Sequence, residues 1–211
     1  MTTITSRINC GNVIKLTNTT AKAIIIDFGD STLKLTENSY PSWQVVSAEG
    51  ISNITIKNGA IIGDRQNHIY IEGDGYSNGG LSDYYETHGH AHGVRFTDCG
   101  NIFMKNMDIH DMPGDGVYIS SYNNTSITNI SECNIHHCRR QGITIAGSDT
   151  TNIYNTEIRH IGTFDGINGT EPMSGIDIEP WVVYSEIAKT VNLDNVAITD
   201  ITNYGVVLRN K

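Results

Sequence analysis

NITIKNGAI (53–61) is the first of five copies of a pattern that decides the fold; the others are NIFMKNMDI (101–109), ITNISECNI (127–135), TTNIYNTEI (150–158) and TVNLDNVAI (190–198). Their final isoleucines form one column, and the apolar residues five positions earlier form a second. Asparagine recurs three positions before the final isoleucine, with Glu132 as the exception. Asparagines at a repeated turn form hydrogen-bonded stacks, so we expect such a stack here.

A second apolar strand follows each copy and begins at a glycine. Val117, Ile143 and Val206 follow the final isoleucine by eight positions, whereas Val94 and Ile176 follow after longer insertions. Period-two strands with glycine corners and repeats of about 23 to 26 residues predict parallel coils stacked about 4.8 Å apart. The expected fold is therefore all-β, a right-handed single-stranded parallel β-helix. A β-sandwich explains the alternation but not the matching columns.

The 211 residues suffice for one domain spanning 1–211, and residues 23–35 and 43–50 read as its lead-in coils. A net charge of −9 without a Lys/Arg run argues against a nucleic-acid partner. The N-terminus shows no signal peptide, no apolar run is long enough for membrane insertion, and the scattered cysteines are expected to be reduced. Because the sequence stops at Lys211 without a capping element, we expect a fragment of a longer chain, or a domain that an oligomer partner caps.

The stretch SGIDIEPW (174–181) contains the leading catalytic candidates. Ile176 and Ile178 are expected to point into the coil, so Asp177 and Glu179 should point outward. Asp115 lies two coils away, about 10 Å from Asp177 by strand spacing. That separation is near the upper end for an inverting glycosidase. Asp177 and Glu179, about 6.5–7 Å apart on one strand, are the competing pair. Against catalysis, Asp115 suits a turn, and the other two acids suit a solvated strand face.

The two insertions, at about 63–92 and 162–173, should flank a groove over these strands, since insertions in repeat folds carry function. Arg139 and Arg140 either bind an acidic group or compensate nearby acids. His88, His90 and His92 alternate, which allows a metal site, but groove lining is the preferred role, and we predict no metal and no cofactor. The expected substrate-binding residues are Arg65, Glu86, His88, His92, Arg95, Tyr118, Arg139, Arg140 and Trp181.

The chain resembles a known group of proteins in five segments: GDR (63–65), ETHGHAHG (86–93), NMDIHDMPGDGVYI (106–119), CRRQGITI (138–145) and SGIDIEP (174–180). They look like the pectate-lyase-like right-handed β-helix proteins, especially those in tail appendages and tailspikes of phages that infect Gram-positive bacteria. That group includes hydrolases, lyases, epimerases and pure binding proteins, so the fold selects no reaction. The paired-aspartate and GHG motifs of polygalacturonases and the calcium-aspartate cluster of pectate lyases are not present as such.

The resemblance and the acids together lead us to expect an enzyme, a phage or prophage tail depolymerase that hydrolyses a bacterial surface glycopolymer. Asp177 and Asp115 would be acid and base, with Glu179 able to replace either. A lyase would instead use Arg140 or a histidine as base and Tyr118 or another group as acid, and only that chemistry would bring in Ca²⁺. The third alternative is a receptor-binding spike without activity. The resemblance implies a virion-tail or extracellular location, a surface polysaccharide or teichoic acid as partner, and a homotrimer in the full-length context.

Overall fold

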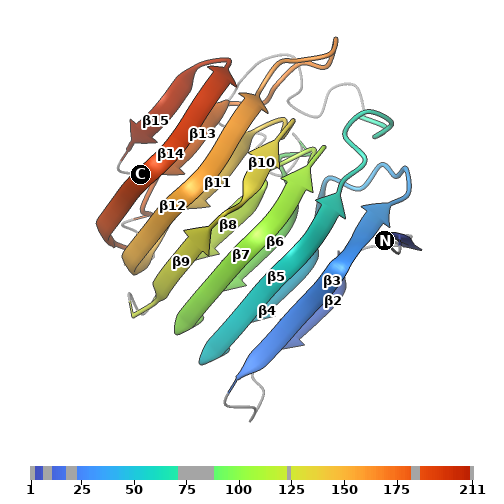
Figure 1. The fold of residues 1–211 in the computed structure, drawn as a ribbon. Helices are drawn as coiled ribbons and strands as arrows, with labels where there is room; N and C mark the ends of the chain where they lie inside the picture. The colour runs from blue at the N-terminus through green and yellow to red at the C-terminus, as the bar shows by residue number, and fades with distance from the viewer. Residues whose placement is uncertain are drawn as a thin grey trace.

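The computed structural model describes residues 3–6, 11–17, 23–70, 88–122, 125–181 and 186–209, and the described residues form strands, turns and loops without a helix (Figure 1). No helix long and apolar enough to cross a membrane occurs among them. The strands are β1 (Thr3–Ser6), β2 (Gly11–Thr17), β3 (Ile24–Leu35), β4 (Ser42–Glu49), β5 (Asn53–Ile62), β6 (His90–Thr97), β7 (Asn101–His110), β8 (Val117–Ser120), β9 (Ile127–Ser131), β10 (Asn134–His136), β11 (Gln141–Ile145), β12 (Ser148–Ile161), β13 (Ser174–Ile178), β14 (Ala188–Ile201) and β15 (Tyr204–Leu208).

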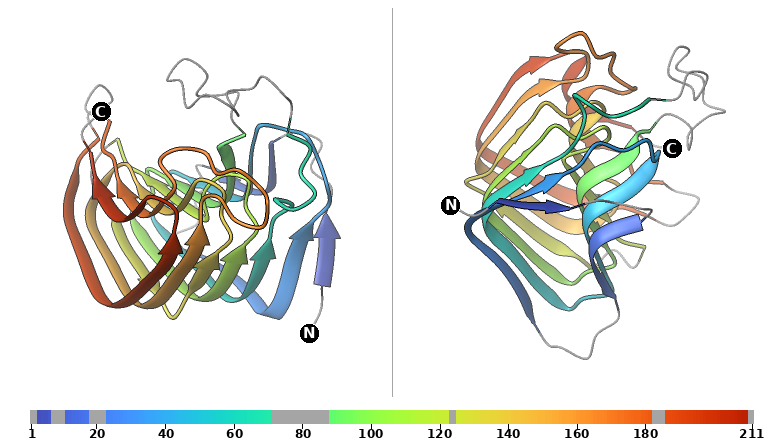
Figure 2. Two further views of the ribbon diagram at one scale, coloured as in Figure 1. Left: turned by 90° about the horizontal axis from the view of Figure 1, so that it is seen from above. Right: turned by 90° about the vertical axis from the view of Figure 1, so that its right-hand side faces the viewer.

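The strands form two sheets, and successive coils place a strand in each. The first sheet has the order β1-β3-β5-β7-β10-β12-β14, with β9 between β7 and β12, and the second has the order β15-β13-β11-β8-β6-β4-β2. Neighbouring strands in both sheets are parallel. Figure 2 shows the coils stacked side by side from the blue N-terminal end to the red C-terminal end. The predicted parallel β-helix is confirmed, including the lead-in strands β3 and β4.

The apolar columns predicted from the repeats are the registers of the two sheets. In the first sheet Ile61 pairs with Ile109, and the column continues through Ile135, Ile158 and Ile198. In the second sheet the paired residues are Val94, Val117, Ile143, Ile176 and Val206. These side chains form the core between the sheets, where all but those of the last coil are buried.

A stack of asparagines marks the turn within the first sheet. Asn58, Asn106, Asn155 and Asn195 all have positive φ between 50° and 60°, a conformation that asparagine tolerates better than most residues. The Asn106 amide donates to Asn58 Oδ1 at 3.2 Å, and that of Asn195 donates to Asn155 Oδ1 at 2.8 Å. Glu132 breaks the sequence pattern but keeps the backbone, with φ 54°. The predicted asparagine stack is therefore confirmed for these two pairs.

A column of glycines brings the coils close together at the start of the second sheet. A Cβ built on Gly142 would lie 2.6 Å from the carbonyl oxygen of Gly175, and one on Gly175 would lie 2.6 Å from that of Gly205. Side chains do not fit at this corner from β6 onward, which explains the glycines there, whereas the lead-in strands β2 and β4 carry Val13 and Val45 at the same position. The residues that follow these glycines are in register from coil to coil.

The last coil leaves part of its core column uncovered. Leu193 and Val206 continue buried columns but are themselves exposed, and Leu208 is 72% exposed. Each of the buried counterparts is covered by the following coil. Elsewhere Cys99, Cys133 and Cys138 are buried free thiols, as expected for reduced cysteines, whereas Cys10 lies outside the described residues.

Candidate functional site

The predicted carboxylates lie on the outer side of the second sheet. Asp177 pairs in register with Thr144, which pairs with Tyr118, which pairs with Arg95. The alternating column contains Ile176 and its buried apolar partners, so Asp177 points away from the core as predicted. Asp115 immediately precedes Gly116, the corner glycine of the coil that lies two before the coil of Asp177.

The alternative that Asp177 and Glu179 form a solvated strand face is wrong. Asp115, Asp177 and Glu179 are each 0% exposed. Buried carboxylates need partners that replace water, and arginine and amide side chains from neighbouring coils provide them. We call this set the arginine–carboxylate network; its members are Asp115, Arg140, Gln141, Thr144, Asp177, Glu179 and Arg209.

Arg140 joins the coil before it to the coil after it. Its Nη1 donates to both carboxylate oxygens of Asp115, at 3.1 and 2.9 Å. Its Nη2 donates to Glu179 Oε1 at 3.2 Å. Thr144 donates to Asp115 Oδ2 at 2.8 Å. One guanidinium group therefore brings together Asp115 and Glu179, whereas the sequence analysis paired Asp177 with Asp115 or with Glu179 and kept Glu179 as a replacement for either acid.

Arg209 holds the other end of the network and was missed by the sequence prediction. Its Nε donates to Asp177 Oδ1 at 3.3 Å, and its Nη2 donates to Asp177 Oδ2 and, at 3.2 Å, to Glu179 Oε2. Gln141 also donates to Asp177. The signal was present, because Leu208 pairs with Ile178 and the next residue must then lie beside Glu179.

Burial changes the protonation of the network. Loss of hydration raises the pKa of Asp115 from 3.8 to about 7, although Arg140 and Thr144 act in the opposite direction. The same cause raises the pKa of Asp177 against the effect of Arg209. Burial also lowers the pKa of His92 well below its usual value. His92 is therefore neutral, and its Nδ1 accepts the backbone N–H of Asp115 at 3.2 Å.

Arg65 and Arg139 lie beneath the surface and fix the second insertion. Arg65 Nη2 donates to the carbonyl oxygens of Gly162 and Phe164 at 3.0 and 3.1 Å. Arg139 donates through Nε to the Asn168 carbonyl at 3.0 Å and through Nη2 to the Thr170 hydroxyl at 3.1 Å. Both arginines are fully buried, so they contact protein groups and not an open groove. Arg65 therefore joins the first insertion to the second.

The first insertion also contains a buried polar chain that the sequence did not predict. His68 Nδ1 contacts Asp64 Oδ2 at 2.9 Å, and its Nε2 contacts Nδ1 of the predicted residue His88 at 2.7 Å. His88 has φ 54° and precedes β6, so it does not alternate with His90 and His92 along a strand. Glu86 lies outside the described residues.

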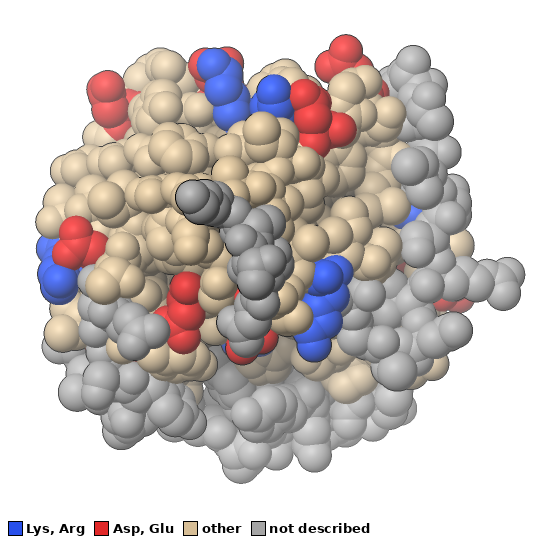
Figure 3. All heavy atoms as spheres, turned by 90° about the horizontal axis from the view of Figure 1, so that it is seen from below, with Lys and Arg blue, Asp and Glu red and all other residues tan. Residues whose placement is uncertain are grey.

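Four partly exposed side chains flank the network in register or in sequence, and we call them its rim: Arg95, Tyr118, Trp181 and Arg209. The Arg95 guanidinium lies 5.2 Å from the centre of the Tyr118 ring, which in turn stacks on His92 at 5.1 Å. On the face shown in Figure 3, basic side chains of the described residues lie singly or in small groups and form no continuous stripe. The rim therefore combines aromatic ring faces with guanidinium groups.

Stacked parallel coils with polar ladders on their outer faces define the class of parallel β-helix proteins. The chain belongs to the family described as "Right handed beta helix region", whose profile matches residues 17–176. This fold is of the type found in carbohydrate-active proteins.

Two relatives come from Bacillus subtilis (strain 168). The chain is 29% identical to the "Uncharacterized protein YclG" over 83% of its own length and 31% of the relative's. It is 24% identical to the "SPbeta prophage-derived uncharacterized protein YorA" over 71% of its length and 25% of the relative's. The chain thus spans less than a third of either relative. No solved structure gives a significant match.

Proposed function

We propose that the protein is a carbohydrate-active β-helix that hydrolyses a bacterial surface glycopolymer with the carboxylates of the arginine–carboxylate network. The observation that carries the proposal is that Arg140 binds Asp115 and Glu179 at once, while the pKa of Asp115 is about 7. Glycosidases need one carboxyl group that keeps its proton near neutral pH and a second that is ionised. Asp115 supplies the first kind of group, and Glu179 and Asp177, which contact arginine, are the candidates for the second.

Asp115 is the proposed general acid, because it holds a proton at a pH where an ordinary aspartate has lost it. Glu179 and Asp177 are the proposed bases. Glu179 contacts two guanidinium groups, which balance its negative charge, and Asp177 contacts Arg209. The structure thereby favours Glu179 more strongly than the sequence did.

The substrate is proposed to be an anionic polysaccharide or teichoic acid that enters at the rim. The side chain of Arg209 is 30% exposed while both of its acidic partners are buried. An anionic group of the polymer can draw this guanidinium away and so open the acids to the sugar, and Trp181 and Tyr118 provide ring faces for sugar contacts. In the full-length context we propose a homotrimer in a phage or prophage tail, which the prophage origin of one relative supports.

The test is to incubate the protein with cell-wall glycans isolated from Bacillus subtilis and to analyse released fragments by mass spectrometry. Hydrolysis adds the mass of water at each cleavage, whereas elimination leaves an unsaturated end. Asp115→Asn and Glu179→Gln should each lower the rate by at least about 100-fold. Asp149→Asn, which alters an exposed acid paired with Lys189, should keep the wild-type rate. Unsaturated ends, or full activity in Asp115→Asn, would refute the proposal.

A binding protein without activity is the second candidate, and complete burial of all three acids favours it. In that case the network serves only to hold the coils together, and the rim binds the polymer. Glycan-binding assays separate the two functions. Binding without fragments, together with weaker binding by Arg95→Ala and Trp181→Ala, supports the spike, whereas fragment release supports the enzyme.

A further inference from the structure

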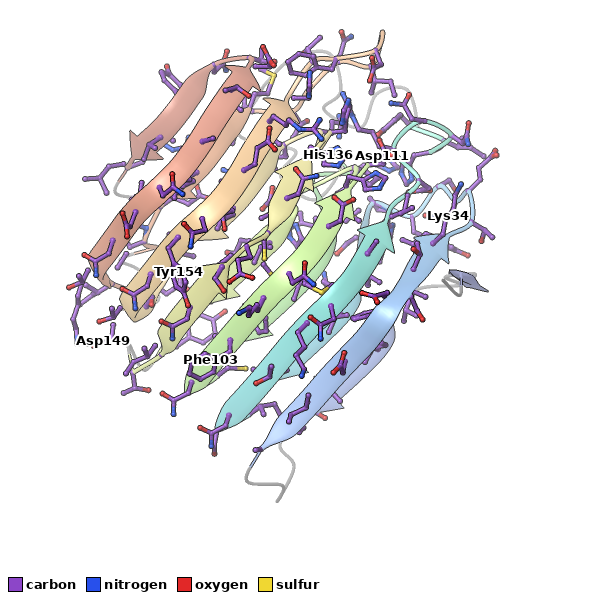
Figure 4. The ribbon with its side chains drawn as sticks, in the orientation of Figure 1. Lys34, Phe103, Asp111, His136, Asp149 and Tyr154 are labelled. Atoms are coloured by element: carbon purple, nitrogen blue, oxygen red, sulfur yellow. The ribbon has the colours of Figure 1, made fainter. Side chains whose placement is uncertain are left out.

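Four polar side chains, which we call the histidine–aspartate square, lie on the outer face of the first sheet, whereas the arginine–carboxylate network lies on the second sheet. Strand β7 ends in Asp108-Ile109-His110, and β10 reads Asn134-Ile135-His136. Asp108 pairs with Asn134, and His110 pairs with His136. Because the isoleucines between them are buried, all four polar side chains share the outer face. Figure 4 shows His136 near Asp111 at the end of these strands.

Three of these residues bring metal-ligating atoms together. One nitrogen from each of His110 and His136 and one oxygen of Asp108 lie within 4.8 Å of one another. His136 Nε2 contacts Asp108 Oδ1 at 3.1 Å. We propose that Asp108, His110 and His136 bind a divalent first-row transition-metal ion such as Zn²⁺. Two ligand atoms of a tetrahedral Zn²⁺ lie about 3.4 Å apart. The ligand atoms of these half-buried side chains therefore have to move about 1 Å closer together when the ion binds.

Neighbouring groups prepare the ring nitrogens for a metal. Asp111 Oδ2 lies 2.8 Å from His110 Nδ1, so the carboxylate can accept a hydrogen bond from this nitrogen and orient the ring with Nε2 available to a metal. His136 Nδ1 lies 2.7 Å from His137 Nδ1. When His136 donates this hydrogen bond, its Nε2, which faces Asp108 Oδ1, carries the lone pair that would bind the ion. Carboxylate and histidine contacts of this kind orient the ligands of metal sites.

A second observation points to a missing ligand at the same place. Asn134 Oδ1 is buried and has no hydrogen-bond partner, although the amide nitrogen of this residue donates to Asp108 Oδ1 at 3.1 Å. A buried acceptor without a donor is rare. Asp108 and Asn134 also line a hollow of about 300 Å³ together with Asp30 and Glu132. These acidic groups make the approach favourable for a cation.

The next coil places Arg159 in the column of His110 and His136, where its charge opposes a cation. Arg159 Nε lies 3.3 Å from Glu157 Oε1, and this carboxylate balances the guanidinium. The proposed ligands contribute one further negative charge through Asp108. The balance of charge at the square therefore permits a divalent ion.

The test is titration of the untagged, metal-free chain with ZnCl₂ in a calorimeter, with the visible spectrum of the Co²⁺ form as a second readout. We expect one ion per chain. His110→Ala and His136→Ala should each weaken binding at least about tenfold and change the Co²⁺ spectrum, and Asp111→Asn should weaken it by about 10 to 100-fold. None of these measurements uses a glycan, so the result is independent of the proposed hydrolase.

Two histidines provide matched controls. His160 lies one coil further along the same edge, where it pairs with Asp200, and His90 belongs to the alternating histidines of β6. His160→Ala and His90→Ala should bind Zn²⁺ like the wild type. Thermal melts without metal check that every variant is folded. The absence of Zn²⁺ binding, undiminished binding in a double His110→Ala, His136→Ala variant, or loss of binding in His90→Ala would overturn the proposal.

Discussion

The arginine–carboxylate network and the histidine–aspartate square are built by the same geometry but differ in cover. Each is a ladder of outward side chains at equivalent positions in successive coils, Asp177 with Thr144 in one and His110 with His136 in the other. The acids of the network are completely buried and paired with arginine. The square is half-buried and contains an acceptor, Asn134 Oδ1, without a partner.

The difference shows that the repeat determines which side chains lie next to one another. Their burial from water then determines which partners they need. Carboxylates removed from water require opposite charges and donors at fixed positions. Side chains that remain in contact with water keep free lone pairs and can exchange a water molecule for another ligand. The same ladder thus gives a charge network on one sheet and a ligand set on the other.

The largest expected effect comes from Arg140→Ala at pH 7. The change leaves Asp115 and Glu179 buried without their shared cation, which should lower the free energy of unfolding by about 3–5 kcal/mol. Urea denaturation measures the loss. Arg159→Ala is the matched control, since its pair with Glu157 is partly solvated and should contribute under about 1 kcal/mol. Equal losses of stability in the two variants would contradict the distinction between the buried charges of the network and the partly solvated side chains of the first sheet.

The next effect comes from the glycine corner on which the network rests. Gly142→Ala places a Cβ 2.6 Å from both the Gly175 carbonyl oxygen and Ile158 Cγ2, so we expect a loss of about 1–3 kcal/mol. Gly205→Ala is the same substitution in the last coil, where the nearest atom is 3.8 Å away. It should leave the free energy of unfolding nearly unchanged. A loss in Gly205→Ala equal to that in Gly142→Ala would show that contact between coils is not the cause.

The ladders themselves could be predicted from the sequence, because they follow from local repetition. The final isoleucines, the asparagine turn and the glycine corner recur at fixed offsets, and a parallel coil turns each offset into a column. Asp177 was placed on the outer side for the same reason. The breaks in the pattern were also informative, since Glu132 keeps the positive φ of the asparagines around it.

The burial of these polar side chains could not be predicted, because it depends on contacts between segments far apart in the chain. Arg65 contacts Gly162 across 97 positions, and nothing near Arg65 in the sequence indicates that it is buried. Arg209 was overlooked because it follows the last strand, although register places it beside Glu179. The square was missed because Asp-Ile-His and Asn-Ile-His were read as core columns, and their polar residues were not followed from coil to coil.

A smaller effect is expected from the pH dependence of the free energy of unfolding, which tests whether Asp115 is buried. Asp115 has a pKa of about 7 when folded and 3.8 as the ordinary value, so between these pH values the folded chain holds a proton that the unfolded chain has lost. Its contribution to stability therefore falls as pH rises from about 4 to 7, by at most about 1.4 kcal/mol per pH unit. Asp115→Asn should remove this contribution to the slope in urea titrations at pH 4 to 7.

Asp149→Asn is the control for the pH dependence. Lys189 lowers the pKa of this exposed carboxyl group, so the group titrates below the window and its loss should leave the slope unchanged. Because the pKa of Asp177 is also raised, part of the slope should remain in Asp115→Asn. A slope equal to that of the wild type would mean that Asp115 does not hold its proton in the folded chain. The acid proposed for catalysis would then be ionised at neutral pH.

The smallest effect is expected from His136→Ala in the metal-free chain. The ring is half-buried and bonded to Asp108 and His137, groups that water can satisfy in its absence, so the free energy of unfolding should change by less than about 1 kcal/mol. Saturating Zn²⁺ should then raise the melting temperature of the wild type but not of the variant, because only the wild type binds the ion when folded. A loss near that of Arg140→Ala without metal would instead make the square a structural element, and the contrast between the two ladders would no longer hold.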